Sequence, residues 1–393
     1  MEYRIRTLNK ISEHGLRLFD DGYKVGSQIA DPHALVVRSA EVDTDVYQNL
    51  IAVARAGAGV NNISIERATE KGICVFNTPG ANANAVAELV FIVLGMYARR
   101  VDKAIAFTQR LKGQDAETIV SAVESSKSQF TGFELAGKTL GVIGLGKIGV
   151  LVANAGGERG MRVVGYDAFP TLTNMHQLSS KVALVRRMED VLTQADVLSV
   201  HVPLNDKTRN LIDAAAITLL KTDCVLMNYA REGICNDEAV LMALDEGRLE
   251  AYITDFPAAS LLDRNGVLCT PHLGASTNES EEKCAEMAVN QIKDYLQYGV
   301  VRNSVNFPVV EDFPRPTARA RLAVVNQDIP GMIEGVTRII REAGINIQHF
   351  KNESNGRIGY SLVDVEADIS QEVVQRIQAL EGILRVRVLR FGS

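Results

Sequence analysis

A glycine-rich turn at residues 144–149 is framed by a pattern that few folds can accommodate. The run Gly144-Leu145-Gly146-Lys147-Ile148-Gly149 follows a strand-like stretch, 138–144, and opens a helical pattern. A second strand-like stretch, 161–166, then ends at Asp167, 18 residues after Gly149. This G-x-G-x-x-G spacing inside a strand–helix–strand unit is typical of a dinucleotide-binding fold with parallel strands.

Each residue type in this turn has a physical reason. Gly144 permits the tight turn, Gly146 lets a pyrophosphate approach the backbone, and Gly149 lets helix and strand pack closely. Asp167 can accept hydrogen bonds from ribose hydroxyls and would repel a 2′-phosphate, which favours NAD over NADP. The alternative is an ordinary turn with a surface aspartate. The residues expected around the phosphates are Gly144, Gly146, Lys147, Ile148 and Gly149.

Strand-like runs alternate with helical patterns on both sides of this turn. An α/β chain with two doubly wound parallel sheets is therefore expected. A long helical pattern, 84–110, is expected to connect the two lobes. The strand-like runs outside the turn lie at 34–39, 50–59, 72–77, 162–167, 197–202, 224–228 and 251–255.

The last part of the chain has a different pattern. A proline-rich stretch at 306–319 indicates a linker or a clamped connection, and the basic run Arg315, Arg319 and Arg321 is expected to face solvent. Beyond it the pattern predicts a βαββαβ unit, a small ferredoxin-like fold. Its expected strands are 321–326, 346–352, 359–365 and 384–391, and its expected helices are 330–342 and 370–380.

Composition excludes several other classes of protein. A net charge of −6 over 393 residues is not that of a general nucleic-acid binder. The longest apolar stretch, 85–98, contains Glu88 and is too short to span a bilayer. Five cysteines without a C-x-x-C pair suggest reduced thiols, with no metal site expected. A cytoplasmic protein that binds neither nucleic acid nor membrane is expected.

Polar groups follow further strand-like runs at 201–204 (HVPL), 228–231 (NYAR) and 254–256 (TDF), and the segment 270–277 reads TPHLGAST. In this order the motifs resemble the D-isomer-specific 2-hydroxyacid dehydrogenases over nearly the first 305 residues. Segments 37–39 (VRS), 55–63 and 77–88 are similar to members that oxidise 3-phospho-D-glycerate. Segments 326–331 and 344–347 resemble an ACT domain, a small amino-acid-sensing module.

The resemblance implies roles for individual residues. His272 would be the acid–base residue and Arg231 the carboxylate clamp, whereas the plain alternatives are a structural histidine and a surface arginine. Asp255 would bond the nicotinamide carboxamide, unless it only caps a helix. Cofactor contacts would also come from His201, Val202, Pro203, Tyr229, Ala230, Arg231, His272 and Gly274. Substrate contacts would come from Arg38, Ser39, Gly57 and Asn82, for which capping of strand ends is the alternative.

Two departures from the family pattern affect this site. The family places a glutamate about five residues after its counterpart of Asp255, where it bonds the catalytic histidine, but residues 255–260 read DFPAAS. Either another acid (Asp263, Glu279 or Glu281) substitutes, or His272 works unassisted. Glu232 stands where the family has glycine and could weaken the hold of Arg231 on an anion.

Three functions remain open on this basis. The first is NAD-dependent oxidation of 3-phospho-D-glycerate, which begins serine synthesis; the second is another 2-hydroxyacid dehydrogenase; the third is an NADH-sensing regulator. Asn326, Asp328 and Asn346 would bind L-serine, or the C-terminal module would only assemble a homodimer or homotetramer. The expected domains are substrate-binding (1–90 and 275–305), NAD-binding (91–274), a linker (306–319) and an ACT-like domain (320–393).

Overall fold

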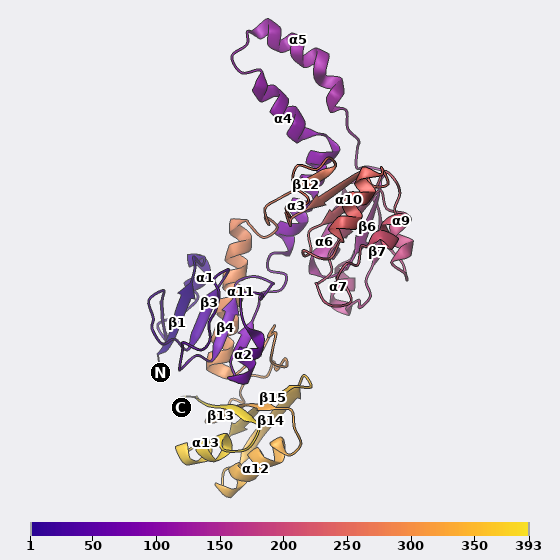
Figure 1. The fold of residues 1–393 in the computed structure, drawn as a ribbon. Helices are drawn as coiled ribbons and strands as arrows, with labels where there is room; N and C mark the ends of the chain where they lie inside the picture. The colour runs from indigo at the N-terminus through magenta and orange to yellow at the C-terminus, as the bar shows by residue number, and fades with distance from the viewer. Residues whose placement is uncertain (1, 392–393) are drawn as a thin grey trace. The chain divides into compact units, whose positions relative to one another are not determined.

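The computed structural model describes residues 2–391, which form two compact units (Figure 1). Unit 1 combines the chain up to Asn82 with the chain from Asn278 onward. Unit 2 is the continuous segment Ala83–Thr277. Unit 1 is therefore discontinuous in sequence, with unit 2 inserted between its parts.

Unit 1 contains a five-stranded parallel sheet in the order β2-β1-β3-β4-β5. Every residue of β3 is buried, as expected for a parallel strand covered on both faces. The helix α11 packs on one face through Ala285, Ala288 and Ile292, and Ala68 of α2 belongs to the cluster on the other face. The elements are β1 (Tyr3–Leu8), α1 (Glu13–Leu16), β2 (Tyr23–Gly26), β3 (Ala34–Val37), β4 (Ala52–Arg55), α2 (Ile65–Glu70), β5 (Cys74–Phe76) and α11 (Asn278–Tyr298).

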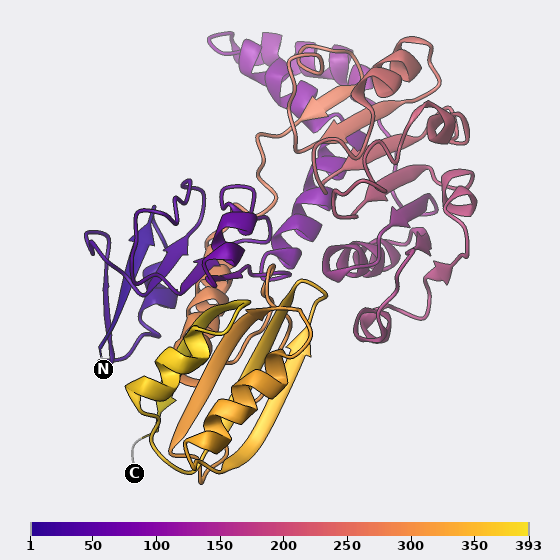
Figure 2. The same cartoon turned by 60° about the horizontal axis from the view of Figure 1, so that its bottom comes forward.

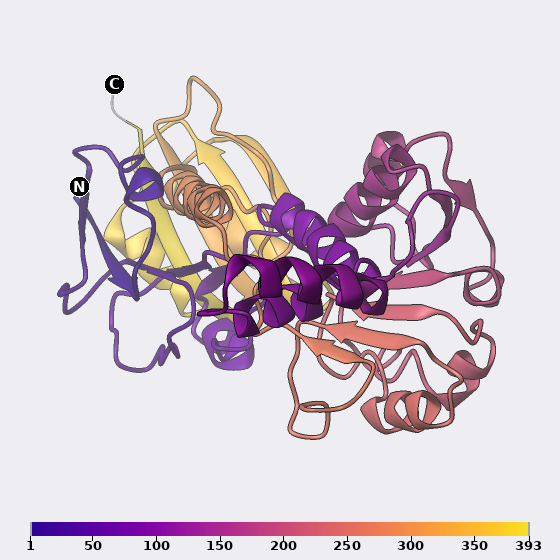
Figure 3. The same ribbon diagram turned by 90° about the horizontal axis from the view of Figure 1, so that it is seen from above.

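Unit 2 contains a seven-stranded parallel sheet in the order β12-β11-β10-β9-β6-β7-β8, with helices on both faces (Figure 3). The strands are β6 (Thr139–Ile143), β7 (Arg162–Tyr166), β8 (Ala183–Leu184), β9 (Val197–Val200), β10 (Val225–Asn228), β11 (Ala251–Thr254) and β12 (Val267–Cys269). The helices are α3 (Ala83–Ala98), α4 (Val101–Arg110), α5 (Ala116–Ser126), the 3-10 helix η1 (Lys127–Phe130), α6 (Lys147–Glu158), α7 (Leu172–Gln177), α8 (Glu189–Leu192), α9 (Ala214–Thr218) and α10 (Asp237–Asp245). Because all seven strands are parallel, their carboxyl ends lie at one edge of the sheet.

The prediction of one long helix at 84–110 is wrong. The chain turns at Arg100, which has φ +50°, so that α3 and α4 are separate helices. The carbonyl oxygen of Ala98 instead accepts the N–H of Phe133 at 2.9 Å, because the returning chain meets the end of α3 there. Helices α4 and α5 bury no residue and extend away from the sheet of unit 2 as a hairpin (Figure 1).

The C-terminal part of unit 1 is a four-stranded antiparallel sheet in the order β14-β15-β13-β16. Helices α12 and α13 cover one of its faces (Figure 2). Its other face belongs to the main core of unit 1, where Tyr360 and Leu362 join the same cluster as Tyr295. The elements are β13 (Ala320–Gln327), α12 (Met332–Glu342), β14 (Ile347–Ser354), β15 (Ile358–Val365), α13 (Gln371–Gln378) and β16 (Ile383–Arg390).

The expectation that Arg321 faces solvent is wrong, because its side chain is fully buried. Its Nε donates to Asp364 Oδ1 at 2.5 Å and its Nη2 donates to Asp312 Oδ2 at 3.1 Å. The backbone N–H of Arg315 also bonds Asp364. The proline-rich stretch is thus clamped to the C-terminal sheet.

The predicted fold class is confirmed. Two parallel-sheet lobes and a βαββαβ ferredoxin-like module are present. All five cysteines are free thiols. Among residues 2–391, no helix combines the length and the apolar character needed to cross a membrane.

Candidate active site

The glycine turn follows β6 at the carboxyl edge of the seven-stranded sheet and leads into α6. Gly144 has φ +90°, and a Cβ there would lie 2.6 Å from the carbonyl oxygen of His201. A Cβ on Gly149 would lie 1.8 Å from the Gly144 carbonyl oxygen. A Cβ on Gly146 would meet nothing within 4 Å, so open space lies over this turn. A pyrophosphate fits there, because Gly146 caps α6 without a side chain and Lys147 and Ile148 begin its first turn.

Asp167 follows β7, beside the glycine turn. Its Oδ2 accepts the N–H of Leu145 at 2.6 Å and its Oδ1 accepts the N–H of Phe169 at 2.7 Å. The carboxylate is therefore held rigidly at the position where the fold places an adenosine ribose.

His201 follows β9 and faces the same turn. Its Nε2 bonds Ser199 Oγ at 2.8 Å, while its buried Nδ1 has no hydrogen-bond partner among the described residues. Burial lowers the pKa of this imidazole from 6.5 to about 4, so the ring is neutral at physiological pH. Val202 is half-buried and Pro203 is exposed beyond it.

Asn228, the last residue of β10, shapes the turn that carries Arg231. Its Nδ2 donates to the Arg231 carbonyl oxygen at 2.9 Å, and its Oδ1 accepts the Ala230 N–H at 3.1 Å. Burial raises the pKa of the Tyr229 phenol and lowers the pKa of the Arg231 guanidinium. No ion pair joins Arg231 to a carboxylate within residues 2–391; Glu232 is exposed and does not bond it. The guanidinium therefore keeps its positive charge free for an anionic ligand.

Asp255 follows β11, and His272 lies in the loop after the neighbouring strand β12. The Asp255 carboxylate is buried and bonds the loop at Thr270, Leu273 and Gly274. His272 is exposed, and its ring packs edge-on against Phe256 with centroids 5.1 Å apart. Of the side chains described, no carboxylate bonds this imidazole, and Asp263 is exposed.

The predicted substrate residues belong to unit 1. Arg38 follows β3, where its Nη1 lies 2.5 Å from Glu281 Oε1, and its carbonyl oxygen accepts Arg55 Nε–H at 3.0 Å. A Cβ on Gly57 would lie 2.6 Å from Arg55 Nη1. The neighbouring Ser39 bonds Asn9 through its N–H, and the buried Asn82 Oδ1 has no partner among the residues described. The sheet edge near β3 and β4 thus brings together two arginines.

The three predicted effector residues are not brought together within one chain. Asn326 pairs across the sheet with Gly359, whereas Asn346 lies beside Glu366, seven residues further along. At 3.3 Å per residue, the position of Asn326 and that of Asn346 are therefore about 23 Å apart along the strand direction. The side chains of Asn326 and Asp328 bond Gln327 and Ser354, and that of Asn346 bonds Glu366.

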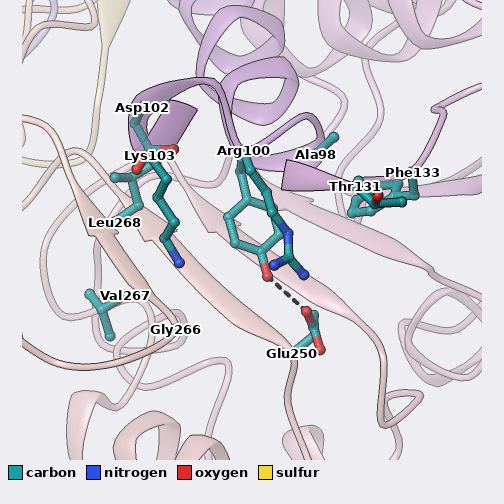
Figure 4. Close-up of a pocket in the computed structure, with 12 residues that line it drawn as sticks. Ala98, Arg100, Asp102, Lys103, Thr131, Phe133, Glu250, Gly266, Val267 and Leu268 are labelled. Carbon is teal, nitrogen blue, oxygen red and sulfur yellow. Dashed lines mark hydrogen bonds between the residues drawn. The ribbon is translucent and has the colours of Figure 1, made fainter. Parts of the chain in front are cut away.

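A separate cavity of about 430 Å³ lies at the opposite edge of the sheet of unit 2 (Figure 4). Glu250 and Gly266 line it just before β11 and β12, and Arg100 and Lys103 line it from the start of α4. Tyr97 donates its hydroxyl to Glu250 at 3.0 Å, and burial raises the pKa of this phenol. Because this cavity borders the amino ends of the strands, it is distinct from the glycine turn.

Three residues at these edges were missed as site residues from sequence: Asn228, Thr270 and Arg55. Asn228, Thr270 and Arg55 each stand at or directly after the end of a strand, which was the available signal. Glu281, one of the acids that could have assisted His272, instead forms an ion pair with Arg38.

The chain is similar to proteins of known function. Residues 100–274 match the model described as "D-isomer specific 2-hydroxyacid dehydrogenase, NAD binding domain". The D-3-phosphoglycerate dehydrogenase of Haemophilus influenzae is 31% identical over 384 residues, covering 94% of this chain and 89% of that protein. The D-3-phosphoglycerate dehydrogenase of Methanocaldococcus jannaschii is 38% identical over 291 residues, covering 72% of this chain. This match spans only 53% of the Methanocaldococcus protein.

The fold is also similar to solved structures. The NAD+-bound 3-phosphoglycerate dehydrogenase of Entamoeba histolytica superimposes with a TM-score of 0.61 at 27% identity, covering 78% of this chain and 99% of that one. The coverage leaves out about a fifth of this chain.

Proposed function

Because this chain belongs to the D-isomer-specific 2-hydroxyacid dehydrogenases, we propose that it oxidises 3-phospho-D-glycerate to 3-phosphooxypyruvate with NAD. The observation that carries this proposal is the common edge in unit 2 where the glycine turn, Arg231 and His272 all follow parallel strands. The substrate itself is supported by the Haemophilus relative, whose similarity extends over 94% of this chain.

The residues of the glycine turn fit NAD. The close approach of Gly149 to Gly144, the open space over Gly146 and the unpartnered Nδ1 of His201 all favour a phosphate-bearing ligand at this edge. When bound, NAD supplies the nicotinamide that accepts hydride. Asp167 would hold its ribose, and the negative charge of this carboxylate disfavours NADP.

Arg231 and His272 would act on the substrate. Two N–H groups of the Arg231 guanidinium can hold a carboxylate and orient the adjacent carbon that bears the hydroxyl. The His272 imidazole would take the hydroxyl proton during oxidation and return it during reduction. Burial of Arg231 in a site without a paired carboxylate strengthens its attraction for an anion.

A turnover assay with a panel of substrates tests this function. We expect NADH formation, followed by absorbance, with 3-phospho-D-glycerate, and slower turnover with D-lactate, D-glycerate and the glyoxylate couple. Faster turnover of an unphosphorylated acid would reassign the substrate. Binding of NADH without turnover of any acid would support an NADH-sensing regulator, which the missing glutamate beside His272 favours.

For the remaining parts of the chain we propose the roles that the resemblance implies. Residues 1–90 with 275–305 would bind substrate, 91–274 would bind NAD, and 320–393 would regulate or assemble a homodimer or homotetramer. Arg38, Ser39, Gly57 and Asn82 would contact the substrate, with Arg38 and Arg55 supplying positive charge for its phosphate. Five free thiols support a reducing, cytoplasmic location.

L-Serine as effector is supported by the resemblance, under one geometric condition. Since Asn326 and Asn346 lie about 23 Å apart along the sheet, a site using both requires two copies of the chain. Equilibrium dialysis with labelled L-serine and sedimentation of the same sample test this together. Saturable binding that is lost in Asn346→Ala would support a sensor, whereas no binding at millimolar serine would leave assembly as the role of the module.

A further inference from the structure

The backbone at His272 has a conformation that residues other than glycine usually avoid. Its φ is +56°, in the left-handed region, where a Cβ costs about 1–2 kcal/mol. The ring has no hydrogen bond to a carboxylate within the described chain and contacts Phe256 edge-on. The direction of this imidazole is therefore set by the turn that carries it, and the turn must itself be held.

Asp255 accepts four of the hydrogen bonds that hold this turn, beside those that the N–H groups of His272 and Thr270 donate to the carbonyl oxygens of Thr270 and Thr254. Thr270 Oγ1 donates to Asp255 Oδ1 at 2.6 Å, and the backbone N–H of Leu273 donates to the same oxygen at 2.8 Å. The backbone N–H of Gly274 donates to Oδ2 at 2.8 Å. The N–H of His272 itself donates to the Asp255 carbonyl oxygen at 3.1 Å. One residue thus bonds both sides of His272.

These contacts occupy most of the Asp255 carboxylate. Asp255 is only 2% exposed, and three of about four acceptor positions on its carboxylate are taken by the loop. A Cβ on Gly274 would lie 3.2 Å from Asp255 Oδ2, so the loop closes tightly over the carboxylate. The backbone of Asp255 is anchored in turn, because its N–H bonds the Asn228 carbonyl oxygen at 3.2 Å.

We propose that Asp255 is a positioning residue, whose buried carboxylate holds the left-handed turn and so aims His272 at the reacting hydroxyl. The inference rests on the proposed function, in which His272 transfers the proton. It assigns to Asp255 a task that the resemblance gave to a glutamate missing from this chain. A 1 Å displacement of a catalytic group can reduce a rate about 10²-fold, so a positioning residue of this kind has a measurable effect.

The test is the variant Asp255→Asn, which keeps the shape of the side chain but sets an NH2 group against a backbone N–H donor. We expect kcat to fall about 10²-fold while the KM for NAD and the Kd for NADH change by less than about threefold. In a His272→Ala background, Asp255→Asn should lower the residual rate by less than about threefold, because it acts through His272. Thr270→Val should give an intermediate loss of kcat that Thr270→Ser restores.

Two outcomes would overturn the proposal. A large rise in the Kd for NADH with kcat unchanged would make Asp255 a cofactor contact. An equal loss of rate in the presence and absence of His272 would show that Asp255 acts independently of it. Asp263→Asn is the matched control, since this exposed carboxylate lies in the same region of sequence and should leave kcat unchanged.

A readout without turnover separates this proposal from the proposed function. The chain has six histidines, so the NMR signals of a histidine-labelled sample can be assigned with His272→Ala. We expect Asp255→Asn to shift the His272 signals and to leave those of the other five histidines in place. Unchanged His272 signals would overturn the positioning role, even if the wild type oxidised no substrate on the panel.

Discussion

Glu281 forms an ion pair with Arg38, with its Oε1 2.5 Å from the Arg38 Nη1. The arginine follows β3, and the glutamate lies in the first turn of α11, so the pair joins two distant parts of the sequence within unit 1. The side chains are 35% and 37% exposed, so solvent screens their attraction. The glutamate competes with any anion that Arg38 binds.

Glu281→Gln is therefore expected to lower the KM for 3-phospho-D-glycerate. An ion pair between half-exposed side chains contributes about 0.5–1 kcal/mol of interaction free energy. Its loss therefore corresponds to a decrease in KM of about two- to fivefold. Steady-state kinetics at fixed NAD measures this, with Glu279→Gln as the control, because that glutamate is exposed on the same turn. A rise in KM would show instead that Glu281 holds Arg38 in its binding geometry.

His272→Ala is expected to reduce kcat by about 10²–10⁴-fold, because it removes the imidazole proposed to take the hydroxyl proton. The Kd for NADH, measured by fluorescence titration, should stay close to the wild-type value. The exposed His176 serves as the control when it is changed to alanine. Wild-type turnover in the His272 variant would remove this residue from the chemistry.

Arg231→Lys is expected to raise the KM for the substrate and to lower kcat together. Lysine retains the charge but cannot hold a carboxylate through two parallel hydrogen bonds. Arg248→Lys, at an exposed ion pair with Glu246, controls for the general effect of the exchange. Normal kinetics in Arg231→Lys would refute a two-pronged clamp.

Arg321→Met is expected to destabilise unit 1 by about 3–5 kcal/mol, because it leaves the fully buried Asp364 without its partner. Urea unfolding of the variant measures the loss. The double variant Arg321→Met with Asp364→Leu should recover part of it, since no unpaired buried charge remains. Arg319→Met, at an exposed position, should change stability little; an equal loss there would contradict the role of the buried pair.

The parts of the fold that sequence predicted correctly depend on local pattern. The glycine turn, its flanking strands and Asp167 all lie within 30 consecutive residues, and the βαββαβ order of the C-terminal module follows from short alternating runs. Strand ends in a parallel sheet share one edge, so the chemistry at Asn228–Arg231 and Thr254–Phe256 could be grouped from sequence alone.

The parts that sequence did not predict depend on partners that are distant along the chain. The break between α3 and α4 arises because Phe133 bonds Ala98, and nothing near Arg100 indicates it. Arg321 is buried because Asp364 and Asp312 are both present to pair with it. The role of Asp255 likewise depends on the loop after the next strand, which folds back over its carboxylate.

His201, whose imidazole Nδ1 is buried, should make unit 2 sensitive to acid. Burial lowers the pKa of its imidazole to about 4, whereas the unfolded chain binds a proton at about 6.5. Between pH 6.5 and pH 4, unfolding therefore takes up a proton at His201. The contribution of the neutral imidazole to the free energy of unfolding is fully present above pH 6.5 and falls by up to about 3 kcal/mol as the pH is lowered towards 4. His201→Asn removes this titration. Urea unfolding at pH 7.5 and at pH 5 measures the effect. Between these two pH values the free energy of unfolding of the wild type should fall by about 2 kcal/mol more than that of the variant. His176→Asn should behave as the wild type, because that side chain is exposed, and equal losses in the wild type and His201→Asn would refute the prediction.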